Sequence, residues 1–596
     1  MGINQRFKQL PNYLILSMVI FTMAIKFQAN SWNKKIIEQD VLSLYAYLPA
    51  AFIYKDVSLS FMNDGKENYY EKFWPIKQAN GKYVIKTTMG TSLMYSPFFF
   101  IAHGIEKLSG KDANGYSATY KTLISFAALF YLVIGLIFTR KLLQKYFDPL
   151  ITSVALLLIY LGTNLFYYTS FEPGMTHVYS FCLIAMFLFY CLKWYEKQKF
   201  TTSAILGVLI GLIVLIRPTN ILIVLLFLLW EISRFYEIKL RLKLLLKNWP
   251  LIALMIITAF MIWIPQLLYW KMQTGSYFIN SYNEQFYFNN FHIHKALLGF
   301  RKGWFIYTPV MFFAVVGVFF MKKKIKAIRT AYYFFLPALI YVTYSWWCWW
   351  YGGSYGARTM IDIYAVMSLP LAALISYFIY KKRITKILTY FAVSLFVVHN
   401  IFQTYQYLKN AIHYDSMTKE AYFDSFLRIN PSEDFESLLV TPDYERAVQG
   451  LPEQRVKPEP LLDCSEKDFS YVNVNMYGKN KDFYIVSDLM VKDSLPDLEG
   501  KILIIPDSEN PFNEDVDLRI GLFSNHVKQW MIEYPLLEIT QNSSEEFRTD
   551  FVIPFSQYNA PNLKIFISNF SYEPIYGERI ELIIHDLEGH YENNVY

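Results

Sequence analysis

Eleven apolar runs, separated by short polar segments, occupy the first two thirds of the chain. A bilayer core about 30 Å thick is crossed by roughly 20 apolar residues in a helix. The pattern therefore predicts eleven membrane spans, followed by a region that has none. The spans fall at about 12–29, 117–139, 149–167, 175–192, 203–216, 219–233, 249–269, 303–320, 331–347, 360–380 and 387–404.

The basic residues between these runs predict the orientation of the chain. Short cytoplasmic loops accumulate Lys and Arg, whereas translocated loops do not. The short segments on the side of the N-terminus hold 22 Lys and Arg, and the opposite short loops hold six. No small-residue cleavage site follows the first run, so we expect that span to be retained. The pattern indicates a multi-pass membrane protein with a cytoplasmic N-terminus and an extracytoplasmic C-terminal domain.

Two segments outside the membrane differ from ordinary loops. Residues 30–116 form a long first outer loop, and its apolar stretches 41–54 and 88–108 suit helices that lie along the membrane interface. After a membrane domain at 1–405, residues 406–459 are expected to form a helical linker. From residue 460 to 596, alternating short runs between Gly, Pro and Asn predict an antiparallel β-sandwich. These runs are 471–476, 483–486, 502–505, 551–555, 563–567 and 580–584.

Composition and charge narrow the functional classes. Hydrophobic residues make up 54% of the chain and charged residues 18%, which excludes a single soluble core. Residues 1–405 carry a net charge of +25 and residues 406–596 a net charge of −18. The basic residues stand in short clusters without an extended basic face, so no nucleic-acid partner is expected. Four cysteines are too few and too scattered for a disulfide framework or a metal knuckle.

Ionisable residues close to the membrane are costly, and those on the outer side are therefore candidates for function. Asp40 stands about ten residues beyond the first span and opens a stretch that contains Tyr45 and suits a helix on the membrane surface. Asp40 is predicted to be a catalytic carboxylate, and a helix-capping role is the alternative. Glu38 is its nearest competitor.

Glu172 and His177 flank Pro173 and Gly174 in a very short outer loop. A carboxylate and an imidazole this close in sequence suit a metal ion or the orientation of a hydroxyl group. A hydrogen-bonded structural pair is the alternative. No cofactor is expected, although a divalent cation near Glu172 and His177 stays open.

Two arginines and an aromatic loop complete the outer set. Arg217 sits at the turn of a short apolar hairpin, where its planar guanidinium matches a phosphate; a snorkelling interfacial arginine is the alternative. The segment from Trp346 to Arg358 combines four tryptophans with three glycines and ends on the arginine. An interfacial aromatic belt does not call for those glycines, so a loop that lines a ligand is favoured.

These segments, taken in order, resemble the GT-C class of glycosyltransferases, in particular the bacterial branch related to protein O-mannosyltransferases and lipid A aminoarabinose transferases. The resemblance covers about residues 10–400. It rests on Asp40 ahead of Tyr45, the segment from Lys86 to Pro97, the His177 loop, Leu215-Ile-Arg-Pro-Thr-Asn220, and the loop that ends at Arg358. The mannosyltransferases have an adjacent Asp-Glu pair, whereas Val41 follows Asp40 here, which leaves the choice between Asp40 and Glu38 open.

The resemblance implies a GT-C-like enzyme of the bacterial inner (plasma) membrane that takes a sugar from a polyprenyl-phosphate donor. It would pass the sugar, with inversion, to a lipid, glycan or protein acceptor at the outer face, with Asp40 as the base. The residues expected to bind the donor phosphate are Lys86, Arg217, Arg301 and Arg358. Those expected to contact the substrates are Tyr45, Glu172, His177, Trp350 and Tyr355.

Three other functions compete with this interpretation. A flippase or secondary transporter tends to show paired repeats with a site at the midplane, whereas here the candidates crowd one interface. A lipid-linked polymerase or O-antigen ligase shares the substrates but does not need the early aspartate. A non-catalytic assembly protein is supported only by the C-terminal region.

Overall fold

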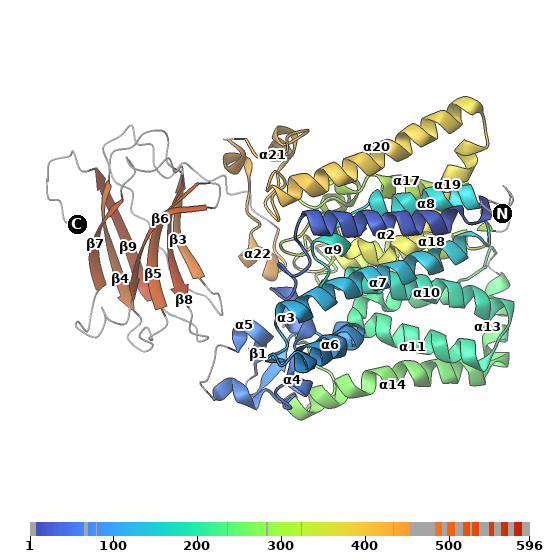
Figure 1. Cartoon of the computed structure of the whole chain (residues 1–596), viewed down its shortest axis with the longest axis horizontal. Helices are drawn as coiled ribbons and strands as arrows, with labels where there is room; N and C mark the ends of the chain where they lie inside the picture. The colour runs from blue at the N-terminus through green and yellow to red at the C-terminus, as the bar shows by residue number, and fades with distance from the viewer. Residues whose placement is uncertain are drawn as a thin grey trace. The chain divides into compact units, whose positions relative to one another are not determined.

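The chain divides into two compact units, Met1–Glu453 and Gln454–Tyr596. The computed structural model describes residues 7–452, apart from 65–68, 79, 235, 282–283, 323–324 and 433. Beyond residue 452 it describes the backbones of seven strands between 483 and 586. The first unit is mainly helical, and strands make up the described part of the second (Figure 1).

Long apolar helices dominate the first unit. Among the described residues, six helical stretches are long and apolar enough to cross a membrane, which identifies the chain as a membrane protein. They are α2 (Leu10–Gln28), α7 (Ala118–Leu143), α10 (His177–Glu196), α14 (Trp249–Thr274), the continuous η5 (Arg358–Ile363) and α19 (Tyr364–Ile379), and α20 (Arg383–Leu408).

The other five predicted spans fall on shorter or interrupted helices, so the number eleven stays a prediction. The run 149–167 breaks near Asn164, whose side-chain amide donates to the Tyr355 carbonyl and accepts a hydrogen bond from Tyr364. The run 303–320 is broken at Pro309. The five runs contain α8 (Pro149–Leu161), α9 (Leu165–Ser170), α11 (Phe200–Ile216), η2 (Pro218–Ile223), α12 (Val224–Leu228), α16 (Trp304–Tyr307), α17 (Val310–Gly317), η3 (Val318–Phe320) and α18 (Arg329–Tyr344).

The helices pack side by side in an order that partly follows the chain (Figure 1). α7 packs on α10, α10 on α11, and α11 on α14. α19 contacts α8, α10, α17 and α20, and most of its side chains are buried, whereas α20 leaves most of its surface exposed. The buried position of α19 fixes η5, the short helix that precedes it, among its neighbours.

Two glycines on α11 allow α14 to approach closely. A Cβ atom at Gly207 would lie 2.2 Å from the Met255 carbonyl oxygen, and one at Gly211 would lie 2.8 Å from the Ala259 carbonyl oxygen. Small residues four positions apart let helix backbones pack tightly in a membrane, where packing rather than the hydrophobic effect holds helices together. The α11–α14 contact therefore depends on these two positions.

Gly207→Leu should lower the stability of the membrane unit by about 1 to 3 kcal/mol, because the added side chain has no room against α14. Thermal unfolding in detergent measures the effect. Gly104→Leu is the matched control, since a Cβ atom there meets nothing within 4 Å, and it should unfold at or above the parent temperature. Equal melting of the two variants would contradict this packing.

The long loop between α2 and α7 is folded. Its stretch 41–54 overlaps α3 (Asp40–Tyr45) and contains α4 (Tyr47–Phe52), and its stretch 88–108 contains α6 (Gly90–Leu108). Both stretches are helical, and their position along the membrane interface stays a prediction. α3 contacts α6, and α6 packs on α7. The remaining elements are η1 (Ser60–Asn63), α5 (Tyr70–Phe73) and an antiparallel pair, β1 (Pro75–Lys77) and β2 (Tyr83–Ile85). We call the part of the bundle that carries this folded loop its loop end.

The remaining helices of the first unit are short connectors. The segment after α20 was expected to be a helical linker over 406–459, but its described part, 409–452, holds only short helices joined by irregular chain. It is fastened to the rest of the unit; for example, the Ser354 amide donates to the Tyr414 carbonyl at 3.0 Å. The helices are α13 (Tyr236–Lys247) and α15 (Ile293–Leu298) earlier in the chain, then α21 (Lys419–Asp424), η6 (Phe435–Leu438) and α22 (Tyr444–Val448).

The second unit contains two antiparallel sheets. One has the strand order β3-β8-β5-β6 and the other the order β7-β4-β9. Four of the predicted runs fall wholly within strands, and 551–555 overlaps β7, whereas 471–476 lies outside the described residues. β5 and β6 were not predicted, and the face-to-face packing of a sandwich stays a prediction. The strands are β3 (Phe483–Met490), β4 (Leu498–Pro506), β5 (Val516–Ser524), β6 (Val527–Pro535), β7 (Phe547–Ile553), β8 (Asn562–Asn569) and β9 (Gly577–Asp586).

Candidate active site

An ion pair joins two residues that the sequence singled out separately. Arg358 opens η5, Asp40 opens α3, and the Arg358 Nη2 atom lies 3.1 Å from the Asp40 Oδ2 atom. The arginine side chain is 13% exposed and the aspartate side chain 46% exposed. Gln39 takes the cap position of α3, so Asp40 is the first helical residue. The pair places an accessible carboxylate against a mostly buried cation.

The second carboxylate of the site is Asp362, which lies on η5 and contacts three polar side chains. The His177 Nδ1 atom lies 3.0 Å from Asp362 Oδ1, and the Asn220 amide donates to Asp362 Oδ2 at 2.7 Å. Arg217 Nη1 lies 3.6 Å from the same Oδ2 atom. Asp362 is 1% exposed, so these polar partners balance the cost of burying its charge. We call Asp40, Arg358, Asp362, Arg217 and His177 the arginine–carboxylate cluster.

The aromatic loop supports the Arg217 guanidinium. The central carbon of that guanidinium lies 5.2 Å from the ring centre of Tyr351, within the range of a cation–π contact. Tyr351 has a φ of 58°, a left-handed conformation that is costly for a bulky residue. Gly352 and Gly356, at 62° and 60°, adopt similar values without that cost. Gly352 and Gly356 thus allow the tight turns of the loop whose Tyr351 ring contacts Arg217. A role of this loop in lining a ligand stays a prediction.

Glu172 and His177 have different partners instead of forming the pair that the sequence suggested. Tyr167 donates its hydroxyl hydrogen to Glu172 at 2.8 Å, whereas His177 faces Asp362. Burial raises the pKa of Glu172. Within the described residues, no group of three or more His, Cys, Asp or Glu side chains is placed to hold a metal ion.

The other two cations expected at the donor phosphate make contacts elsewhere. Lys86 lies 3.2 Å from a Glu284 carboxylate oxygen, and the other oxygen of that carboxylate accepts a 2.7 Å bond from the Trp347 indole. Arg301 donates to the Val440 carbonyl at 3.1 Å and lies over the Trp350 ring. Their role at a phosphate stays a prediction.

Three aromatic residues expected to contact substrate are buried by packing. The Tyr45 hydroxyl donates to the Gly115 carbonyl at 2.6 Å. The Trp350 indole donates to the Tyr444 hydroxyl at 3.3 Å, and the Tyr355 ring packs against Tyr167. Tyr45, Trp350 and Tyr355 are each no more than 1% exposed. In this structure they shape the surroundings of the cluster, and direct substrate contact stays a prediction.

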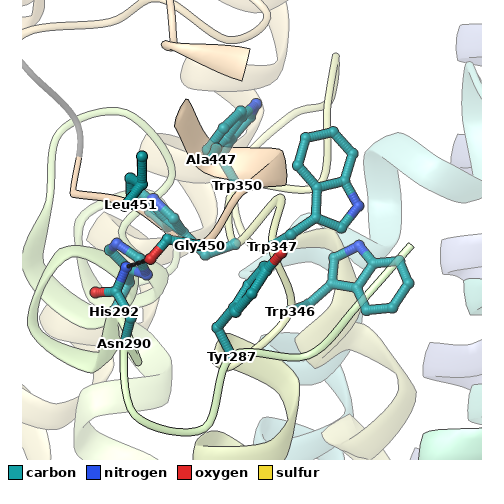
Figure 2. Close-up of a pocket in the computed structure, with 10 residues that line it drawn as sticks. Tyr287, Asn290, His292, Trp346, Trp347, Trp350, Ala447, Gly450 and Leu451 are labelled. Atoms are coloured by element: carbon teal, nitrogen blue, oxygen red, sulfur yellow. Dashed lines mark hydrogen bonds between the residues drawn. The ribbon is translucent and has the colours of Figure 1, made fainter. Parts of the chain in front are cut away.

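A small aromatic pocket lies beside the Trp350 segment (Figure 2). Figure 2 shows the indoles of Trp346 and Trp347 on one side, with Asn290 and His292 grouped on the other. The Asn290 amide donates to the Gly450 carbonyl at 2.7 Å, which fastens the segment after α22 to the chain between α14 and α15. The lining residues are Tyr287, Asn290, His292, Trp346, Trp347, Trp349, Trp350, Ala447, Gly450 and Leu451.

Lys302 holds the aromatic loop in place. It was not among the predicted site residues. Its ammonium group donates to the carbonyl oxygens of Ser354 and Tyr414, and its side chain is almost fully buried. Burial lowers the pKa of Lys302 to about 7 from its ordinary value of 10.5. This lysine ties the loop that precedes Arg358 to the segment after α20.

Between about pH 7 and pH 9, the stability of the parent relative to Lys302→Met should rise. The unfolded chain keeps a proton on Lys302 that the folded chain loses above about pH 7, so the cost of burying the charge disappears as the pH increases. Melting temperatures of both proteins at several pH values measure the difference. A difference that is constant or that falls with pH would contradict this account of Lys302.

The sequence prediction did not assign two residues to the site: Asp362, a member of the cluster, and Asn220, which donates a hydrogen bond to it. Asn220 belongs to the segment Leu215-Ile-Arg-Pro-Thr-Asn220, and Asp362 lies near the start of the predicted span 360–380. The signal that could have identified Asp362 is its place four residues after Arg358, at the start of an apolar span.

Comparisons with known proteins gave similarities at the level of structure alone. No protein-family model matches the sequence, and no curated protein matches it. The structure is similar to the archaeal oligosaccharyltransferase AglB from Archaeoglobus fulgidus in complex with an inhibitory peptide and a dolichol-phosphate. That similarity has 12% identity, a TM-score of 0.37 and coverage of 75% of this chain. A crystal structure of the Archaeoglobus fulgidus oligosaccharyltransferase in the apo form is similar at 14% identity and a TM-score of 0.36, also over 75% of this chain.

This chain spans 61% of the length of each of those two structures. The function of this protein therefore has to be inferred from the residues of its own arginine–carboxylate cluster.

Proposed function

We propose that this protein is a membrane glycosyltransferase that moves a sugar from a polyprenyl-phosphate donor to an acceptor hydroxyl at the outer face of the membrane, with inversion. The observation that carries the proposal is the Asp40–Arg358 pair, together with Arg217, which contacts Asp362 on the same short helix, η5, that Arg358 opens. It combines an accessible carboxylate with two guanidinium groups at the loop end of a membrane bundle. A hydroxyl nucleophile needs a base, and a departing phosphate needs cations.

The chemical step assigns one task to each group. The acceptor oxygen forms a bond to the anomeric carbon of the donor sugar while its proton passes to the Asp40 carboxylate. The bond between the anomeric carbon and the phosphate oxygen breaks, and its electron pair stays on the phosphate. Arg217 and Arg358 stabilise that charge through charge-assisted hydrogen bonds, for which the guanidinium plane is suited.

The position of Asp40 supports its choice over Glu38 as the base. Asp40 is paired with a cation of the cluster, whereas Glu38 is an exposed residue in the chain that leads to α3. A base has to lie within reach of the reacting hydroxyl, next to the group that holds the leaving phosphate. Asp40 meets this requirement if Arg358 holds the donor phosphate.

The proposal extends to the orientation of the chain. The loop end is the extracytoplasmic side, because the basic short segments lie at the opposite ends of the spans. The bacterial inner membrane is the proposed location, and the second unit is proposed to be extracytoplasmic.

A transfer assay in liposomes tests the proposed function. The full-length protein is supplied with a panel of undecaprenyl-phosphate hexoses and pentoses together with a membrane extract as the source of acceptor. We expect one donor to be consumed, with undecaprenyl phosphate and a sugar-labelled acceptor as products. If the protein instead carries donors across the bilayer and leaves all of them intact, a flippase is the correct assignment.

A further inference from the structure

The Asp40–Arg358 ion pair creates a conflict for the proposed reaction. The Asp40 oxygen that accepts a hydrogen bond from Arg358 is not free to accept the proton of a hydroxyl group. A guanidinium occupied by a carboxylate has fewer donors to offer to a phosphate. The 3.1 Å contact between them therefore describes a site in which neither residue is ready for its task.

We propose that the donor phosphate replaces Asp40 as the partner of Arg358, so that binding of the donor frees the catalytic base. We call this replacement the exchange. This inference rests on the proposed function and adds an order of events to it. The donor binds first, Arg358 turns from the carboxylate to the phosphate, and Asp40 then accepts the proton of the acceptor hydroxyl. Without a donor, the base stays paired and unreactive.

The exposure of the two partners favours this exchange. The Asp40 side chain is 46% exposed, so water solvates its carboxylate once the arginine leaves. Ion pairs with an exposed partner contribute little to stability, whereas a guanidinium binds phosphate through strong, planar hydrogen bonds. Arg358 is 13% exposed, and its Nη1 atom faces the Met175 sulfur at 4.0 Å, which is a weak acceptor. The phosphate therefore offers Arg358 a better partner at little cost to Asp40.

Asp362 provides the contrast within the same cluster. Its carboxylate is buried, and His177 and Asn220 contact it at 3.0 and 2.7 Å. Arg217 is the most distant of its three partners at 3.6 Å, so Arg217 can also turn toward a phosphate while Asp362 keeps its shorter contacts. Asp362 therefore keeps its partners when the donor binds, whereas Asp40 gives up Arg358 to the phosphate.

A binding measurement on five forms of the full-length protein, the parent, three single variants and one double variant, tests the exchange. The probe is undecaprenyl phosphate, titrated in detergent and followed by native mass spectrometry. Asp40→Asn removes the anion that competes for Arg358, so it should bind the probe about threefold more tightly than the parent. Glu38→Gln removes an equal charge two residues away and should bind as the parent does. The double variant Asp40→Asn/Arg358→Ala should bind the probe no more tightly than Arg358→Ala alone.

The outcomes separate this inference from the proposed function. A tighter complex in Asp40→Asn, lost on adding Arg358→Ala and reduced at high salt, supports the exchange. If the parent binds the probe and Asp40→Asn binds it equally or more weakly, the exchange is wrong while the proposed function stands. Equal tightening in Glu38→Gln also overturns the exchange, since it would report net charge alone. If the parent does not bind the probe at all, both proposals fail.

Discussion

Asp40→Asn should reduce sugar transfer at least about a hundredfold, the usual size of a general-base contribution. The amide keeps the shape of the side chain at the first position of α3 but accepts no proton. Because removal of the carboxylate leaves Arg358 in place, the variant should still bind undecaprenyl phosphate. Initial rates of transfer in liposomes, with donor in excess, measure the effect.

Glu38→Gln is the matched control for this prediction, because it changes the neighbouring carboxylate that the sequence alone could not separate from Asp40. It should transfer sugar at nearly the parent rate. If Asp40→Asn is active and Glu38→Gln is inactive, the base has been assigned to the wrong residue. If both are active, the carboxylate in the first loop is not the base.

Arg217→Ala and Arg358→Ala should each weaken binding of undecaprenyl phosphate by roughly ten- to a hundredfold, because a hydrogen bond between charged groups contributes about 1.5 to 3 kcal/mol. Arg217 loses its contacts with Asp362 and Tyr351, and Arg358 loses its contact with Asp40, so folding has to be checked by thermal unfolding. Native mass spectrometry in detergent gives the affinity.

Arg329→Ala is a close control, since the Arg329 guanidinium lies over the Tyr333 ring at 5.8 Å much as Arg217 lies over Tyr351. Arg329 belongs to a predicted cytoplasmic segment. Its removal should leave the affinity for undecaprenyl phosphate unchanged. Equal losses in all three variants would show that the lipid responds to net charge rather than to the cluster.

Local chemistry made four members of the cluster predictable from the sequence. They are ionisable residues next to apolar runs, and such residues are rare enough to stand out: Asp40, His177, Arg217 and Arg358. The sequence did not reveal that Asp40 and Arg358 pair with each other, because 318 positions separate them. Pairing over such a distance is set by the packing of the helices.

Asp362 shows where this reasoning stops. Its partners His177 and Asn220 lie 185 and 142 positions away, so its sequence neighbourhood shows only an aspartate that opens an apolar span. The aromatic residues show the opposite problem. Tyr45, Trp350 and Tyr355 look like sugar-stacking residues in sequence, yet their rings are buried by neighbours, and composition does not separate these two uses.

The secondary structure was also predictable where local sequence determines it. The long apolar runs became helices because every backbone polar group in a bilayer needs an internal partner. Runs containing internal breaks, such as that near Asn164, became pairs of short helices. In the second unit, β5 and β6 were not predicted, although the alternation of apolar and polar residues from Val516 to Leu522 is typical of a strand.

A structure of the full-length protein with undecaprenyl phosphate tests the central claim most directly. The account predicts the phosphate within about 4 Å of both the Arg217 and Arg358 guanidinium groups, with Asp40 released from Arg358. A phosphate bound elsewhere on the molecule, with the Asp40–Arg358 pair intact, would contradict it.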